Sequence, residues 1–258
     1  MTVAGVGFAL FLPALMAGSA GIRTHLEQGQ LAWRQSCSQV PPGDECVRVT
    51  EARQTIAMIK GPLHRGLGCV HMREPRRVAV FPRNPRLVRR AQHHFHLVAR
   101  DAGADLEARA HALFYLAEKE REDFLRVAVH DVSSGGRKLQ MLEQAKRAYL
   151  ETAAVGEPLW VLAAHARIGS LYRDFDTQVR ADEFGDWLRA QAIPWFQRCL
   201  RQAHDLSEYG QWSDGCWLAL NEYLPYEYPR AYEIGLALEH APPMAVVPAF
   251  LRSRLDAL

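Results

Sequence analysis

Three neighbouring histidines form the tightest group of metal-ligating side chains in this chain, at His93, His94 and His96. His93 and His96 are three residues apart, so on a helix they share a face and can hold a metal ion between them. A metal site needs at least a third ligand, and the candidates are Cys69, His71 and His111. The spacing matches no zinc-finger or metalloprotease motif. A polar helix face is therefore the simpler interpretation.

A run of alternating charges contains several carboxylates that could act as acid and base. It comprises Glu118, Lys119, Glu120, Arg121, Glu122 and Asp123. On a helix, consecutive residues fan around the axis, and opposite charges three or four residues apart neutralise one another. The pattern therefore favours a solvated helix face over a catalytic site.

A basic stretch precedes and includes the start of a predicted helix: Arg73, Arg76, Arg77, Arg83, Arg86, Arg89 and Arg90. Such a stretch can bind phosphates or an acidic partner. Aromatic residues that could stack on bases are scarce there, so a solvated face near lipid headgroups is favoured over nucleic acid. Gly66-Leu67-Gly68 lacks the rest of a nucleotide-binding loop, and no Gly-x-Ser-x-Gly elbow occurs. We therefore expect neither catalytic nor cofactor-binding residues, and no resident metal or cofactor.

Five cysteines bear on the compartment in which the protein works. Cys199 and Cys216 lie at similar distances on either side of a turn near residues 207–210. In an antiparallel hairpin they would lie at a similar height, which would permit a disulfide if both face inward. Cys37 and Cys46 flank a Pro-Pro-Gly turn and could close a small loop, with Cys69 left over. The connectivity stays open, and Cys199 and Cys216 can equally be small buried apolar residues.

The elements that must position these side chains centre on a helical hairpin, Leu139–Phe175. Apolar residues recur at spacings of three and four in both halves, and Gly156 and Pro158 separate the halves. Small residues beside large ones allow the two helices to approach closely. The expected core of the hairpin is Ala145, Tyr149, Trp160, Ile168, Gly169 and Tyr172.

The offsets Ala164-x3-Ile168-Gly169-x2-Tyr172 resemble the first helix of a tetratricopeptide repeat. Ala145-x3-Tyr149 resembles the second helix of a preceding repeat, and Leu113-x2-Leu116-Ala117 another first helix. Residues 112–124, 142–175 and 199–229 together resemble the tetratricopeptide-like envelope proteins of myxobacteria, some of which belong to the gliding-motility machinery. This resemblance requires an insertion near residues 130–136. It implies an exported scaffold that binds other envelope proteins.

Periodicity predicts an all-α fold, an antiparallel helix-pair array (a tetratricopeptide-like α-solenoid) with a small irregular N-terminal segment. The predicted helices are 85–102, 106–130, 137–154, 158–178, 181–206 (bent or broken at Pro194) and 211–224, with a shorter helix at 25–35. Residues 133–136, Ser-Ser-Gly-Gly, are expected to be a flexible joint. The best strand candidate is 77–81, bounded by two prolines. Aromatic residues concentrate near the C-terminus and are expected mostly in the core: Trp187, Trp195, Trp212, Trp217, Tyr223, Tyr226 and Tyr228.

The N-terminal apolar run, Val3–Ile22, predicts an export signal with small residues at 18–20. An uncleaved anchor and a buried helix are the alternatives. We expect residues 1–20 to be the signal peptide or anchor and 21–83 a segment of uncertain fold. Residues 84–229 are expected to form the helical array and 230–258 a C-terminal packing tail.

Hydrophobic content of 48% and a net charge of +2 are those of a globular protein without an overall drive towards nucleic acid. The sequence therefore predicts a non-catalytic, exported protein–protein interaction scaffold of the cell envelope, periplasmic or envelope-associated and part of a complex. Two alternatives stay open: a metal-binding protein or metalloenzyme that uses His93 and His96, and an Arg-rich cytosolic adaptor for nucleic acid.

Overall fold

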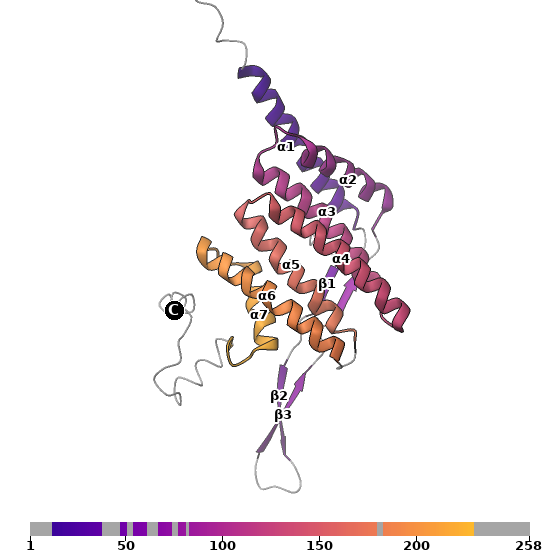
Figure 1. Cartoon of the computed structure of the whole chain (residues 1–258), viewed down its shortest axis with the longest axis vertical. Helices are drawn as coiled ribbons and strands as arrows, with labels where there is room; N and C mark the ends of the chain where they lie inside the picture. The colour runs from indigo at the N-terminus through magenta and orange to yellow at the C-terminus, as the bar shows by residue number, and fades with distance from the viewer. Residues whose placement is uncertain are drawn as a thin grey trace, which may run out of the picture.

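The computed structural model of the chain describes the backbone of residues 12–37, 47–50, 54–60, 67–73, 77–80, 83–179 and 183–229. Side chains are described for residues 20–37, 80, 83–179 and 183–229. The described residues form seven helices and four strands (Figure 1). The helices are α1 Leu12–Gln35, α2 Pro85–Arg100, α3 Leu106–Arg126, α4 Val132–Ala154, α5 Pro158–Asp176, α6 Glu183–Leu206 and α7 Gln211–Tyr223. The strands are β1 Val47–Thr50, β2 Gln54–Lys60, β3 Leu67–Arg73 and β4 Arg77–Val80.

The helices form an array in which each one packs against the next in the chain. Contacts join α1 with α2 and continue pair by pair to α6 with α7, and Figure 1 shows the helices stepping across the molecule in that order. The packed core of the described residues is all-α, as predicted. Helix α3 also contacts α1 and α5. No described helix is long and apolar enough to cross a membrane.

Local signals in the sequence explain where the helices begin and end. Asn84 accepts a hydrogen bond from the backbone of the first turn of α2, and Pro85 occupies the first helical position. Asp105 caps α3 in the same way. Gly156 adopts a φ of 82° between α4 and α5, a left-handed conformation that suits glycine. These signals are local in the chain, and the predicted ends of these helices therefore lie close to the observed ones.

The prediction of a flexible joint at residues 133–136 was wrong, because these residues form the first turn of α4. The Asp131 carboxylate accepts from the Ser134 backbone N–H at 2.7 Å, and the Ser134 hydroxyl accepts from the Asp131 N–H at 3.0 Å. This reciprocal capping satisfies N–H groups that a helix start leaves open. The helix therefore begins at Val132, five residues before the predicted start, and most of the insertion expected at 130–136 is helical.

Helix α6 runs as one helix through Pro194, so a break at that residue does not occur. The proline side chain is exposed, on the side of α6 away from the core. The lost N–H donor removes one backbone hydrogen bond, and the buried residues on either side, among them Ala192 and Phe196, keep both halves packed against the array.

The predicted strand at 77–81 is confirmed as β4, and its partner is β1. β2 and β3 form a second antiparallel pair. Thr50 faces Arg77 and Gln54 faces Arg73, so equal numbers of residues separate the two pairs on each side. One hairpin register therefore runs through both pairs, and β4 contacts α3. The described part of 47–80 is a hairpin ribbon, where the sequence analysis expected an irregular segment.

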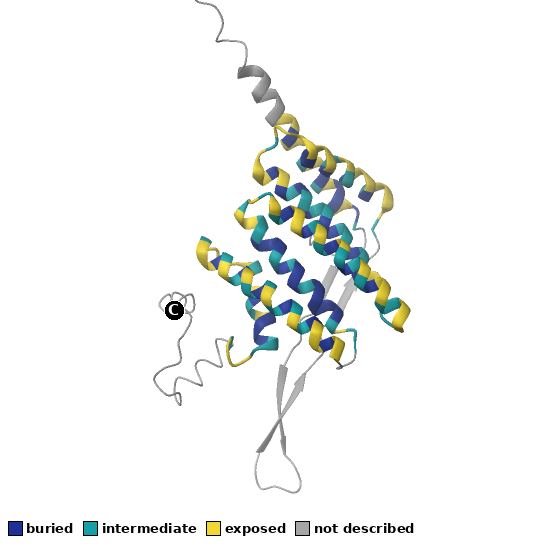
Figure 2. Cartoon of the chain, viewed as in Figure 1, coloured by how far each residue is buried: buried dark blue, intermediate teal, exposed yellow. Residues whose placement is uncertain are grey.

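Two groups of buried residues make up the core of the described part of the chain; buried residues are dark blue in Figure 2. The N-terminal core cluster is formed by α1, α2 and the start of α3, around Trp33 and Phe95. The C-terminal core cluster spans α3 to α7 and includes Phe124, Tyr149 and Phe196. Helix α1 is therefore part of the packed array, although the sequence analysis placed its second half in a segment of uncertain fold.

A disulfide joins α6 to α7 between Cys199 and Cys216, with an S–S distance of 2.10 Å and a Cα–Cα distance of 6.5 Å. The sequence left this pairing open as one that a hairpin would permit, and both residues are fully buried. Cys37 is also in a disulfide. Its predicted partner, Cys46, lies outside the described residues.

Candidate functional site

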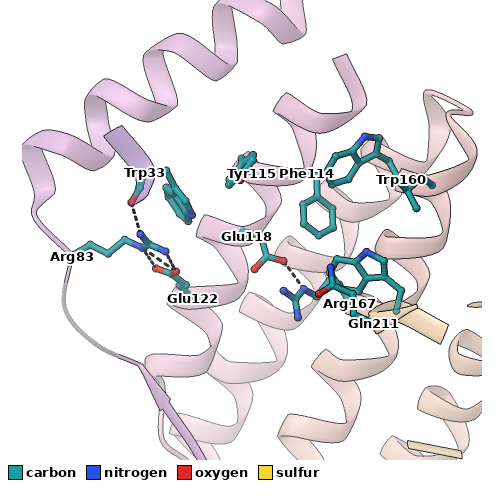
Figure 3. Close-up of a pocket in the computed structure, with 11 residues that line it drawn as sticks. Trp33, Arg83, Phe114, Tyr115, Glu118, Glu122, Trp160, Arg167 and Gln211 are labelled. Carbon is teal, nitrogen blue, oxygen red and sulfur yellow. Dashed lines mark hydrogen bonds and ion pairs between the residues drawn. The ribbon is translucent and has the colours of Figure 1, made fainter. Parts of the chain in front are cut away.

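A cavity of about 500 Å³ opens among α1, α3, α5 and α7 (Figure 3). Its volume falls in the range of roughly 300–1,000 Å³ that is usual for ligand sites. Aromatic side chains, two carboxylates and two guanidinium groups line it: Trp33, Arg83, Phe114, Tyr115, Glu118, Glu122, Leu159, Trp160, Arg167, Gln211 and Trp212. Trp33 and Trp212, the first and last of these residues in the chain, are 179 positions apart (212 − 33), so folding assembles this cavity.

Aromatic rings form a connected lining along the cavity. Trp33 makes an edge contact with Tyr115 at 6.1 Å between ring centroids. Phe114 packs against Trp160 at 5.0 Å and against Trp212 at 5.7 Å. His111 bridges the two groups, because its ring stacks on Tyr115 at 5.2 Å and on Trp160 at 4.2 Å. The lining is therefore held in place by ring–ring contacts on several helices.

Arg83 and Glu122 form a buried ion pair at the α1 side of the cavity. The Arg83 guanidinium donates to the Glu122 carboxylate at 2.6 to 2.9 Å and lies over the Trp33 ring at 3.7 Å. It also donates to the Trp33 carbonyl and the Ser36 hydroxyl, both at 2.8 Å. A single arginine thus joins the C-terminal end of α1 to α3. Figure 3 shows this arginine between the tryptophan ring and the carboxylate.

Glu118, one helical turn from Glu122, is the second carboxylate. It accepts hydrogen bonds from the Tyr149 hydroxyl at 2.6 Å, from Arg167 Nε at 2.7 Å and from Arg121 Nη1 at 3.2 Å. Burial alone would raise the pKa of Glu118, but Arg167, Arg121 and the hydrogen bonds hold the pKa below its ordinary value. Glu118 is therefore ionised at neutral pH.

The prediction that residues 118–123 form a solvated face was wrong for three of the six. Glu118, Arg121 and Glu122 have exposed fractions of 8%, 1% and 2%. Their partners are distant in sequence, so the alternation of local charges could not show them. One signal was available: Glu118 and Arg121 follow Phe114 at helical spacings of four and seven, on an apolar face. Arg83, assigned to the basic stretch, is likewise buried in an ion pair, whereas Arg86, Arg89 and Arg90 are exposed.

His111, a candidate third metal ligand from the sequence, lies behind the cavity wall, where its ring stacks on Tyr115 and Trp160. Its Nε2 lies 3.1 Å from the Gln30 amide nitrogen. Burial, and then the charge of Arg34, lower the pKa of His111 from 6.5 to about 4. The ring is therefore neutral at physiological pH and serves as an aromatic spacer with one polar contact.

The two histidines at the centre of the metal hypothesis, His93 and His96, are both exposed on α2. His94 lies between them and points elsewhere: its Nδ1 is 3.1 Å from Nδ1 of His25 in α1. The side chains of Cys69 and His71 lie outside the described part of the chain. Among the residues whose side chains are described, no three histidine, cysteine, aspartate or glutamate residues come together as a metal-binding group.

The residues predicted as the core of the helical hairpin divide between core and cavity. Ala145, Tyr149, Ile168, Gly169 and Tyr172 are buried in the C-terminal core cluster. Trp160 is half-buried and lines the cavity. Of the C-terminal aromatic residues expected mostly in the core, Trp212 lines the cavity, while Trp187 is 41% and Tyr226 is 99% exposed. Ring size and helical spacing did not distinguish core from cavity wall.

Comparison with protein-family models, with curated proteins and with solved structures finds no match to this chain. The chemistry of the site therefore rests on its own geometry. Both carboxylates are engaged by arginines, and Glu118 is ionised, so Glu118 is not poised to donate a proton. The cavity presents aromatic surface and fixed hydrogen-bonding groups, which are features typical of binding sites.

Proposed function

We propose that this chain is a non-catalytic binding protein, an exported scaffold of the bacterial cell envelope that holds a partner protein in the cavity between α1, α3, α5 and α7. The observation that carries the proposal is the cavity wall, in which connected aromatic rings surround carboxylates already paired with arginines. Interfaces concentrate binding energy in such aromatic and arginine groups.

The placement in the envelope has separate support. A disulfide between Cys199 and Cys216 is compatible with an oxidising compartment. The resemblance of residues 112–124, 142–175 and 199–229 to tetratricopeptide-like envelope proteins points the same way. Under this proposal the helical array is an α-solenoid of tetratricopeptide type, and the apolar run at the N-terminus directs export.

Site-specific photo-crosslinking tests the proposal. A photoreactive amino acid placed at Leu159, which lines the cavity and is 43% exposed, should capture a discrete envelope protein in intact source cells. The same substitution at Leu218 is the matched control, since this residue is also 43% exposed and lies outside the cavity lining. The captured protein is then purified and its affinity for the wild-type chain is measured.

The Trp160→Ala variant completes the test, because it removes a large part of the cavity wall. Partner binding should weaken by at least about 10-fold, as is usual for an interface hot spot. Equal crosslinking at Leu159 and Leu218, or unchanged affinity of Trp160→Ala, would argue against the cavity as the binding surface. Sequencing the N-terminus of the protein from the same cells tests export: a mature start near Gly21 supports it, and an intact N-terminus with all of the protein in the cytosol contradicts it.

A further inference from the structure

The charged groups of the cavity already form ion pairs with one another, which restricts the kind of ligand that the cavity can bind. Glu122 accepts from Arg83 and Arg126, and Glu118 accepts from Tyr149, Arg167 and Arg121. An ionised carboxylate offers about four lone-pair positions, so these acceptors are nearly filled. A charged ligand would compete with these buried ion pairs for the same groups, which disfavours its binding. The geometry therefore favours an uncharged ligand.

The polar groups that are left over in the cavity wall are mainly donors. No hydrogen bond joins the indole N–H of Trp160 or Trp212, or the side-chain amide of Gln211, to another residue within the described ranges. Indole N–H groups can only donate, and an amide donates and accepts. The wall thus presents aromatic faces and spare donors, with few spare acceptors.

A ligand that complements this wall has flat apolar faces and hydrogen-bond acceptors but few donors. Proline residues have these properties, because the ring is apolar, the carbonyl accepts and no N–H remains. Proline-rich segments form an extended polyproline II helix that docks on aromatic grooves. We propose that the cavity binds a proline-rich segment of the partner protein in this conformation, with Trp160 and Trp212 donating to its carbonyls. The inference rests on the proposed function and names the partner's chemistry.

Carbohydrates also stack on aromatic rings, but the wall suits them less. Each sugar hydroxyl brings a donor that must find an acceptor on binding, and the carboxylates that would supply acceptors here are already occupied by arginines. Burying unpaired hydroxyl donors costs free energy. Because Glu118 and Glu122 already accept hydrogen bonds from arginines, the cavity favours a proline-rich peptide over a carbohydrate.

Calorimetric titration of the purified full chain with acetyl-decaproline-amide tests the inference. Binding should be measurable below about 1 mM, and a Gly-Ser peptide of the same length should not bind. Trp160→Phe and Trp212→Phe each keep an aromatic ring and remove the N–H, so each should weaken binding about 3- to 10-fold. Trp187→Phe, an exposed tryptophan outside the cavity, is the control and should leave the affinity unchanged.

Gln211→Ala keeps the inference testable if the tryptophan variants misfold, because Gln211 lines the cavity but is exposed, so its loss should not disturb the fold. It should weaken decaproline binding by a smaller factor while the thermal midpoint stays that of the wild type. Absence of decaproline binding, equal binding by both Trp→Phe variants and the wild type, or preferential binding of chitohexaose would overturn the inference.

Failure of the inference is distinguishable from failure of the proposed function. If a partner is captured at Leu159 but excess decaproline does not displace it, the scaffold function is supported and the proposal of a proline-rich ligand is contradicted. If decaproline binds as expected but no partner is captured at Leu159, the proposed ligand chemistry is supported and the envelope scaffold function is contradicted.

Discussion

The Tyr149 hydroxyl donates to the Glu118 carboxylate at 2.6 Å and so links α4 to the carboxylate that also binds Arg167 of α5. Both side chains are buried. Burial, followed by the charge of Glu118, raises the pKa of Tyr149 well above its ordinary value. The phenol is therefore a fixed donor, and the contact can be removed without changing a charge.

Tyr149→Phe should destabilise the fold by about 1.5–3 kcal/mol, the contribution usual for a hydrogen bond to a charged group. Urea unfolding of the variant and the wild type measures the difference. Tyr226→Phe is the matched control, because Tyr226 is 99% exposed, and its unfolding midpoint should not move. A Tyr149→Phe variant as stable as the wild type would show that the arginines alone satisfy Glu118.

His111 should make stability depend on pH in the acid range. Its pKa in the folded state is about 4, against 6.5 for the ordinary group, so between these values the unfolded chain binds more protons. The contribution of neutral His111 is complete above pH 6.5 and is lost as the pH falls towards 4. His111→Gln cannot be protonated and should flatten this slope.

Urea midpoints measured at intervals from about pH 7.5 to about pH 4 test the His111 prediction. His130→Gln is the control, because this histidine is exposed before α4. An identical pH slope in the wild type and the His111→Gln variant would contradict the assignment of this dependence to His111.

Gly169 allows α5 and α6 to approach, and Gly169→Ala should destabilise the fold. A Cβ atom at this position would lie 2.7 Å from the Phe196 ring, which is fully buried. We expect a loss of about 1–3 kcal/mol, the usual cost of overpacking. Gly136→Ala is the matched change, because a Cβ there meets nothing within 4 Å.

The control variant, Gly136→Ala, should raise the free energy of unfolding, since alanine in an open helical position stabilises by about 0.5–1 kcal/mol relative to glycine. Chemical denaturation measures both variants. If both substitutions stabilise the protein, the close packing of α5 on α6 at Gly169 is refuted.

The disulfide between Cys199 and Cys216 should stabilise the C-terminal helices. The two cysteines are 17 residues apart, and closing a loop of that length contributes about 3 kcal/mol in the chain-entropy estimate. The Cys199→Ala/Cys216→Ala variant isolates this effect from Cys37, which is in another disulfide. Its thermal midpoint should fall below that of the oxidised wild type. A free-thiol assay that finds both cysteines reactive in the unfolded, unreduced protein would refute the bridge.

The sequence predicted the features that are encoded locally. Asn84 and Pro85 mark the start of α2, Gly156 and Pro158 mark the turn into α5, and the observed helices lie close to the predicted ranges. The reciprocal capping of Asp131 and Ser134 is also local, but two glycines beside it favoured a loop. Packing of α4 on α3 overrides that weak preference.

The cavity could not be predicted, because its parts meet only after folding. Arg83 and Glu122 are 39 residues apart, and Glu118 and Arg167 are 49 residues apart. From the sequence, the carboxylates are expected to pair with their nearest neighbours in the chain, as they would on an isolated helix. The long-range arginine partners turned an expected solvated face into the floor of a cavity.

Helix α3 connects the two core clusters mechanically. This helix contributes Ala108 and Ala112 to the N-terminal core cluster and Phe124 to the C-terminal one. A pull that separates the two ends of the array is therefore transmitted through α3, beside Arg83 and Arg167. A ligand segment seated against Trp33 on one side and Trp212 on the other would span that joint, so its docking would stiffen the molecule against tension.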